Sequence, residues 1–123
     1  MLNSDKGKTL SFKSSSSKAI VNNQFVELEP LVTIDKGTWL IQIITNFAKN
    51  NIGSRIVWLK SNHNYDSNIS CTEKALDNST TDVNTVGIYE CVENNVALTI
   101  QVYQDCGASL ALNKYHLVAV KLR

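Results

Sequence analysis

Alternation of apolar and polar side chains is the pattern that most constrains how this chain folds. Residues 96–103, VALTIQVY, place a branched aliphatic side chain at every second position. Side chains two residues apart share one face of a β-strand, whereas the faces of a helix repeat about every 3.6 residues. No long stretch of the chain shows the helical repeat. The sequence therefore predicts an all-β domain, either a sandwich or a barrel.

We expect about eight strands, joined by short turns and one long loop. Asn-Asn pairs at 22–23, 50–51 and 94–95 mark turns, because asparagine tolerates left-handed backbone and bonds to its own main chain. Pro30 lacks an amide donor, so the segment that contains it is an edge strand or carries a bulge. The expected strands are 19–21, 25–34, 38–48, 55–60, 80–92, 96–103 and 114–123, and 80–92 is expected to break near Gly87. Residues 61–79 are expected to form a polar loop that contains one short strand, ISCTEKAL.

Two of these strands are apolar on both faces, which a lone sandwich does not require. In 38–48, the face with Trp39, Ile41 and Ile43 lies opposite Leu40 and Ile44. The last strand likewise places leucine and alanine on one face and two valines on the other. The extra apolar face must be covered by another copy of the chain or by loops and the N-terminal segment of the same chain. The pattern leaves both possibilities open.

Composition bounds the class of protein. A length of 123 residues fits one domain, and a hydrophobic fraction of 43% suits a folded core. The net charge of +1 gives no electrostatic case for nucleic acid or an anionic membrane as partner. No apolar run is long enough to span a bilayer, so no membrane span is expected. The first residues lack the apolar stretch of a secretory signal, so no signal is expected either.

The N-terminal residues have a different composition from the rest. They are polar, end in four serines and contain little to bury, so residues 1–18 are interpreted as an arm or tether and residues 19–123 as the domain. The three cysteines, Cys71, Cys91 and Cys106, have no CxxC spacing. We expect reduced, mostly buried thiols, with a single disulfide as the alternative.

Chemistry-bearing motifs are weak. Cys106 lies beside a glycine, and His63 and His116 are available, but no nucleophile elbow or Cys-His signature is present, so no catalytic residues are expected. His63, Asp66 and Cys71 lack zinc-ligand spacing. The alternating oxygen donors of 62–68 lack the central glycine and final glutamate of a calcium loop. We therefore expect no metal and no cofactor.

Ligand recognition is a further hypothesis for the loop NHNYDSN, residues 62–68. It combines a tyrosine with a histidine and several amides, a mixture that suits a sugar ring and its hydroxyl groups, although an ordinary solvated loop has the same composition. The candidate ligand residues are His63, Asn64, Tyr65 and Asp66. Tyr103 and Tyr115, on either side of the QDCG turn, form a second candidate.

Three longer motifs together resemble a known family. The motifs are NNQFVELEPLVTID, the following GTWLIQIITNFAKNNIGSRIVWLK, and NNVALTIQVYQDCGASLALNKYHLVAVKL. In order and spacing they resemble the C1q/TNF-like jelly-roll domains of bacteriophage virion proteins. The resemblance covers residues 19–123. It departs from the family at 61–79, and no collagen-like repeat precedes it.

The resemblance implies a jelly roll of about ten strands that forms a homotrimer. It implies that the apolar strands meet near the threefold axis, and the expected interface residues are Trp39, Ile41, Ile43, Leu117 and Ala119. The implied role is a non-enzymatic virion protein made in the host cytoplasm: the head of a fibre or a receptor-binding tip that displays loops to host-surface carbohydrate. Its arm would dock on other virion proteins. The alternatives are a capsid-decoration or joining protein without a host ligand, and a secreted C1q/TNF-like ligand.

Overall fold

The computed structural model describes residues 7–29, 32–61 and 65–123, without the side chains of 65–68. Within these residues the chain forms ten β-strands in two antiparallel sheets, which confirms the all-β class. The strands are β1 (Thr9–Lys13), β2 (Lys18–Ile20), β3 (Val26–Glu27), β4 (Val32–Ile34), β5 (Gly37–Phe47), β6 (Ser54–Lys60), β7 (Tyr65–Lys74), β8 (Thr81–Cys91), β9 (Val96–Gln104) and β10 (Leu110–Lys121). The described part of the chain contains no helix that is long and apolar enough to cross a membrane.

The two sheets have interleaved connections. One sheet has the order β1-β10-β5-β8, with β2 also pairing with β10; it is called the β10 sheet. The other has the order β3-β9-β6-β7, with β4 also pairing with β9; it is called the β9 sheet. From β4 to β10 every connection except β6–β7 passes from one sheet to the other, so the core between them is built from the whole chain.

The core fills the space between the sheets. One side of β5 and one side of β10 point into it, and Trp39, Ile41 and Leu117 are at most 1% exposed. The alternating apolar side chains of β9, Val96, Leu98, Ile100 and Val102, face them from the other sheet. The sequence pattern of residues 96–103 is therefore confirmed as a half-buried strand.

The first strand corrects the expected boundary at residue 18. Thr9–Lys13 pairs with β10 from Thr9↔Val120 to Lys13↔His116 and forms an edge of the β10 sheet. Leu10 and Phe12 point inward and pack against the core. Two apolar residues in a polar segment are too short a pattern to predict a strand. The segment is extended because it pairs with β10, which is distant in the sequence.

Strands β7 and β8 are longer and more regular than expected. β7 covers ten residues of the segment interpreted as a loop, and β8 is continuous through Gly87. A Cβ atom at Gly87 would lie 2.7 Å from Cγ1 of Ile69, on β7. Glycine is therefore present because the two sheets approach closely at this margin of the sandwich, and not because the strand is broken.

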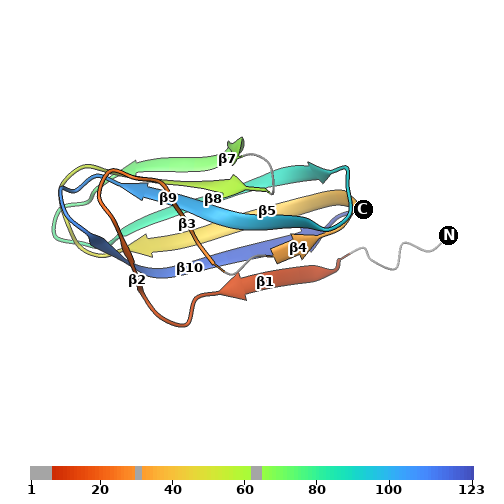
Figure 1. The fold of residues 1–123 in the computed structure, drawn as a ribbon, viewed down its shortest axis with the longest axis horizontal. Helices are drawn as coiled ribbons and strands as arrows, with labels where there is room; N and C mark the ends of the chain where they lie inside the picture. Colours follow the sequence, from red (N-terminus) through yellow and green to blue (C-terminus); the bar gives the residue numbers. More distant parts are fainter. Residues whose placement is uncertain (1–6, 30–31, 62–64) are drawn as a thin grey trace.

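The two ends of the sandwich differ. Figure 1 shows that β1 begins and the C-terminus lies at one end, here called the terminal end, while the β5–β6, β7–β8 and β9–β10 turns lie at the other, the loop end. Asn23 and Asn95 adopt φ of 60°, as the Asn-Asn pairs predict. After the third pair, at 50–51, the left-handed residue is Gly53, with φ of 79°. The position also requires glycine because an added Cβ would lie 2.2 Å from the Asp105 carboxylate.

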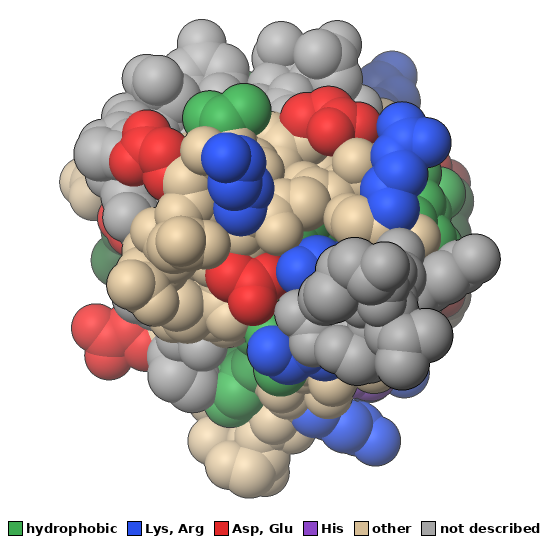
Figure 2. Space-filling view, turned by 90° about the vertical axis from the view of Figure 1, so that its right-hand side faces the viewer, with side chains coloured by type: hydrophobic (Ala, Val, Ile, Leu, Met, Phe, Trp, Pro, Cys, Tyr) green, Lys and Arg blue, Asp and Glu red, His purple; other side chains and the backbone are tan. Residues whose placement is uncertain are grey.

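Charged side chains of both signs are scattered over the terminal end, among other side chains and backbone (Figure 2). The nearly buried ammonium of Lys121 lies 3.0 Å from Oδ1 of Asp35 and 5.7 Å from the ring centroid of Trp39. Lys8 approaches the same carboxylate at 4.0 Å. The hydrogen bond from Lys121 lowers the pKa of Asp35. This ion pair links β10 to the β4–β5 turn.

Candidate interaction surface

The outward side of the β10 sheet carries an aliphatic surface with Gln42 in its middle row. Residues directly opposite each other in antiparallel strands share a face. Val120, Leu40 and Ile88 form one row across β10, β5 and β8, and Val118, Gln42 and Val86 form the next. His116, Ile44 and Asn84 form a third row. The aliphatic face is defined as Leu40, Ile44, Val86, Ile88, Val118 and Val120.

The aliphatic face is accessible in the single chain. Val86 and Ile88 on the edge strand β8 are 58% and 52% exposed, and the other four side chains are half-buried. A row of exposed β-branched residues on an edge strand is a site for association unless something covers it. The described parts of the chain outside the sheet leave these two side chains open to solvent.

A polar margin surrounds the aliphatic face. On the β1 side, Thr9 and Ser11 lie beside Val120 and Val118. Toward the loop end, the Asn46 amide donates to Asp82 at 2.6 Å and accepts from Asn113 at 2.8 Å. An apolar centre within a polar rim is the usual anatomy of a protein–protein interface.

The expected interface residues lie on the other side of the same strands. Trp39, Ile41, Ile43, Leu117 and Ala119 are 0–1% exposed inside one sandwich, between its two sheets. A second copy of the chain does not reach them in this fold. This corrects the expected residues: the side chains available to a partner are those at the alternate positions of β5 and β10.

The expected ligand residues fall in three places. His63 and Asn64 lie outside the described residues. Tyr65 and Asp66 belong to β7, opposite Lys60 and Leu59, but their side chains lie outside the description. This end of β7 lies in the half of the β9 sheet nearer the terminal end, because Lys60, the partner of Tyr65, also pairs with Thr99 near the start of β9.

The two tyrosines of the second candidate are not together. Tyr115 is 8% exposed, lies 5.8 Å from the ring of Phe12 and donates its hydroxyl proton to the carbonyl of Glu29. It is a core residue of the β10 sheet, which corrects its assignment to a ligand site. Tyr103 lies on the outward side of the β9 sheet, where its hydroxyl donates to Oδ1 of Asn23 at 2.6 Å.

The three thiols are partly or fully buried. All three cysteines are free, and Cys91 and Cys106 are buried. Cys106 donates to the carbonyl of Ala108, two residues along its own turn. Burial raises the pKa of Cys91 and of Cys71, which favours the unreactive thiol. No group of three or more His, Cys, Asp and Glu side chains that could hold a metal occurs in the described residues.

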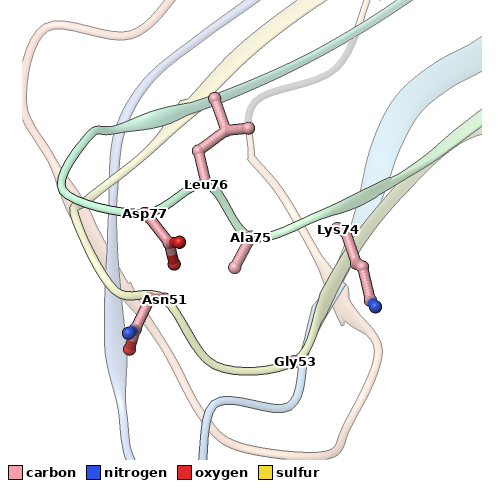
Figure 3. Close-up of a pocket in the computed structure, with 6 residues that line it drawn as sticks. All are labelled: Asn51, Gly53, Lys74, Ala75, Leu76 and Asp77. Carbon is pink, nitrogen blue, oxygen red and sulfur yellow. The ribbon is translucent and has the colours of Figure 1, made fainter.

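The loop end has a shallow pocket of about 430 Å³. Figure 3 shows it between the β5–β6 and β7–β8 connections, with Asn51 and Asp77 on its two sides. Asn51, Gly53, Lys74, Ala75, Leu76 and Asp77 line it. The backbone of Ala75 donates to the carbonyl of Gly53 at 3.0 Å, so the two connections are tied together behind the pocket. The residues that line the pocket are few and of mixed polarity, so they do not indicate a particular class of ligand.

No protein-family model and no curated protein sequence matches the chain. Solved structures do match its fold. Eiger TNF from S. frugiperda has a TM-score of 0.65 at 9% identity and covers 94% of this chain and 93% of its own. The globular domain of zebrafish complement 1qA has a TM-score of 0.58 at 10% identity, with 93% and 95% covered. An infectious bursal disease virus chain, Gx strain, gives 0.59 at 6% identity, with 94% of this chain and 34% of its own covered.

These similarities confirm the fold that the sequence motifs predict. The protein is a C1q/TNF-like jelly roll, and the same architecture occurs in a viral chain. At 6–10% identity the likeness concerns the fold alone. The function has to be argued from the surfaces of this chain.

Proposed function

We propose that the chain is a non-enzymatic display domain of a bacteriophage virion that assembles as a homotrimer through its aliphatic face. The observation that carries the proposal is the exposure of Val86 and Ile88 beside the half-buried Val118 and Val120 in one sheet. Burial of such a surface stabilises by about 25 cal/mol per Å² of apolar area. The threefold arrangement and the virion context follow from the resemblance of the sequence motifs to phage jelly rolls.

The arrangement of the ends supports a display role. β1 begins at the terminal end, so a carrier bound through the preceding N-terminal residues would lie there (Figure 1). The turns of the loop end would then point away from the carrier, in three copies. Three weak contacts combined in one assembly give much higher avidity than one.

The test of assembly uses two exposed isoleucines as a matched pair. Ile88 on the aliphatic face is 52% exposed, and Ile52 in the β5–β6 connection is 56% exposed. We expect the unmodified chain to have three times the monomer mass by light scattering, and Ile88→Asp to be monomeric, because it places a charge in the contact. Ile52→Asp should remain trimeric. A monomeric unmodified chain at tens of micromolar, or a trimer that survives Ile88→Asp, would refute the proposal.

The carrier role has a separate test. Deletion of residues 2–6 leaves β1 and all the described strands in place. We expect this variant to form the same trimer but to be absent from purified virions assembled in its presence. Incorporation equal to that of the complete chain would show that the N-terminal residues are not the tether.

A further inference from the structure

The outward side of the β9 sheet carries three aromatic rings in contact. Phe25, just before β3, stacks on Trp58 of β6 with centroids 4.4 Å apart and an interplanar angle of 4°. Tyr103 of β9 lies 4.9 Å from Phe25 with its ring tilted by 35°. Phe25 is 40% exposed, and Trp58 and Tyr103 are half-buried. These three residues are called the aromatic patch.

Polar atoms hold the rings of the aromatic patch in place. The indole N–H of Trp58 donates to Oε1 of Gln101 at 2.5 Å. The hydroxyl of Tyr103 donates to Oδ1 of Asn23, whose φ of 60° fixes the turn before β3. The patch is therefore organised before any ligand arrives, which lowers the entropic cost of binding.

Hydrogen-bonding side chains lie next to the rings. Glu27, Gln101 and Trp58 are directly opposite one another across β3, β9 and β6, so they share the outward face. Glu27 accepts from Lys60 at 3.2 Å. The amide of Gln101 that accepts from Trp58 also carries two N–H donors. The surface thus offers ring faces together with amide, carboxylate and ammonium groups within one small area.

We propose that the aromatic patch binds a pyranose sugar, with Phe25 and Tyr103 packing on the ring and Gln101 and Glu27 pairing with its hydroxyl groups. A sugar presents both an apolar ring face and closely spaced hydroxyls, and this surface offers a partner for each. Three rings are too few for a stable protein interface, which buries about 800 Å² on each side. The aliphatic face has the opposite character, because its six side chains are hydrocarbon, with Gln42 between Val118 and Val86.

The proposal rests on the proposed function in one respect. A trimer assembled through the β10 sheet leaves the β9 sheet outermost, so three aromatic patches are presented around the assembly. Each site is nevertheless complete within one chain, because Trp58, Tyr103 and Gln101 belong to the same sheet and Phe25 lies against two of them, just before β3. A monomeric variant therefore keeps the site and loses only its multiplicity.

The test is an NMR titration with methyl glycosides of glucose, galactose, mannose and N-acetylglucosamine. Trp58 and the fully buried Trp39 provide two indole signals in the same molecule. We expect at least one glycoside to shift the Trp58 indole and the Gln101 side-chain amide, with Kd in the range of about 1–10 mM, and to leave the Trp39 indole unchanged. Shifts elsewhere, or none with any glycoside at about 100 mM, would overturn the proposal.

Variants distinguish binding from a merely structural role of the rings. Phe25→Ala and Tyr103→Ala should each weaken the glycoside at least tenfold, while Tyr103→Phe, which keeps the ring, should weaken it less. Phe12→Ala removes an aromatic ring of the other sheet and should leave the affinity unchanged. Equal affinity in Phe25→Ala and the unmodified chain, with both folded by circular dichroism, would refute the assignment.

The failure of this proposal is separable from the failure of the trimer. Ile88→Asp should bind the free glycoside with unchanged Kd but lose binding to a surface densely coated with the same sugar. Sugar binding by a chain that is monomeric throughout would support the aromatic patch and refute the trimer. A trimer whose aromatic patch captures a virion protein and no glycoside would overturn the patch assignment alone.

Discussion

At the scale of single residues, the least expected feature is a fully buried arginine. Arg55 is 0% exposed and donates to the carbonyls of Asn50, Ile52 and Ser54 at 2.9–3.1 Å. Its guanidinium lies 6.0 Å from the ring centroid of Phe47, and burial lowers its pKa. Arginine suits this position because its planar group reaches several carbonyls at once. It fastens the β5–β6 connection, which forms one side of the pocket at the loop end.

Acid sensitivity is expected from Asp35. Its pKa is lowered in the folded chain, chiefly by the hydrogen bond from Lys121. A carboxyl with a lowered folded pKa stabilises the fold above its unfolded pKa, and this contribution is lost as the pH falls through the folded value. The contribution is below about 1 kcal/mol, because the Asp35 side chain is 37% exposed and screened by water.

We therefore expect Asp35→Asn to lower the free energy of unfolding by up to about 1 kcal/mol at neutral pH. The difference from the unmodified chain should shrink as the pH falls through the lowered folded pKa of Asp35, since the carboxyl is then protonated in both states. Urea denaturation followed by circular dichroism at several pH values measures this difference. A difference that grows toward low pH would contradict the assigned ion pair.

At the scale of strands, the alternation of the sequence predicts which segments are extended but not which side of them is inside. Ile43 and Ile44 are the same residue type, yet Ile43 is fully buried and Ile44 lies on the aliphatic face. Because β5 is apolar on both sides, its pairing with β10 and the position of the β9 sheet determine which side of β5 faces the core. The aromatic patch escaped prediction for a related reason: its rings come from positions 25, 58 and 103 and meet only across paired strands.

The turns were more predictable than the faces. Asparagine pairs at 22–23 and 94–95 fix left-handed backbone locally, so their effect is visible in the sequence. β1 is the contrary case, because two apolar residues gain their meaning from a partner about a hundred positions away. Tyr115 shows the same limit: it follows the β9–β10 turn closely in sequence but points into the core.

The integration of β1 into the fold can be measured by truncation. Deletion of residues 2–6 should leave the free energy of unfolding unchanged, whereas deletion of 2–13 should lower it by about 2–4 kcal/mol. The larger deletion removes Leu10 and Phe12 from the core and uncovers the edge of β10. Urea denaturation of both variants gives the comparison. Equal stability of the two would show that β1 does not contribute to the fold.

At the scale of the whole molecule, the two outward faces have complementary roles in the proposed assembly. The aliphatic face offers mainly hydrocarbon and fits another protein surface, while the aromatic patch combines rings with amides and fits a small polar ligand. The division follows the two sheets, so assembly through one leaves the other free.

Assembly predicts a melting temperature that depends on protein concentration. Anything that binds the folded chain alone stabilises it by mass action, and further copies of the chain do so with the logarithm of their concentration. We expect the melting temperature of the unmodified chain to rise over a hundredfold increase in concentration, and that of Ile88→Asp to stay constant. Calorimetry at several concentrations measures both, and a constant value for the unmodified chain would argue against the trimer.

The pairing of β1 with β10 also bears on how the molecule is made. Thr9 and Val120 lie directly opposite each other in paired strands, so the ribosome must deliver everything between them before this sheet can close. Until then β5, which pairs with both β10 and β8, emerges with hydrocarbon on two sides and an open edge. The nascent polypeptide therefore passes through an interval in which a chaperone has more to recognise than in the finished domain.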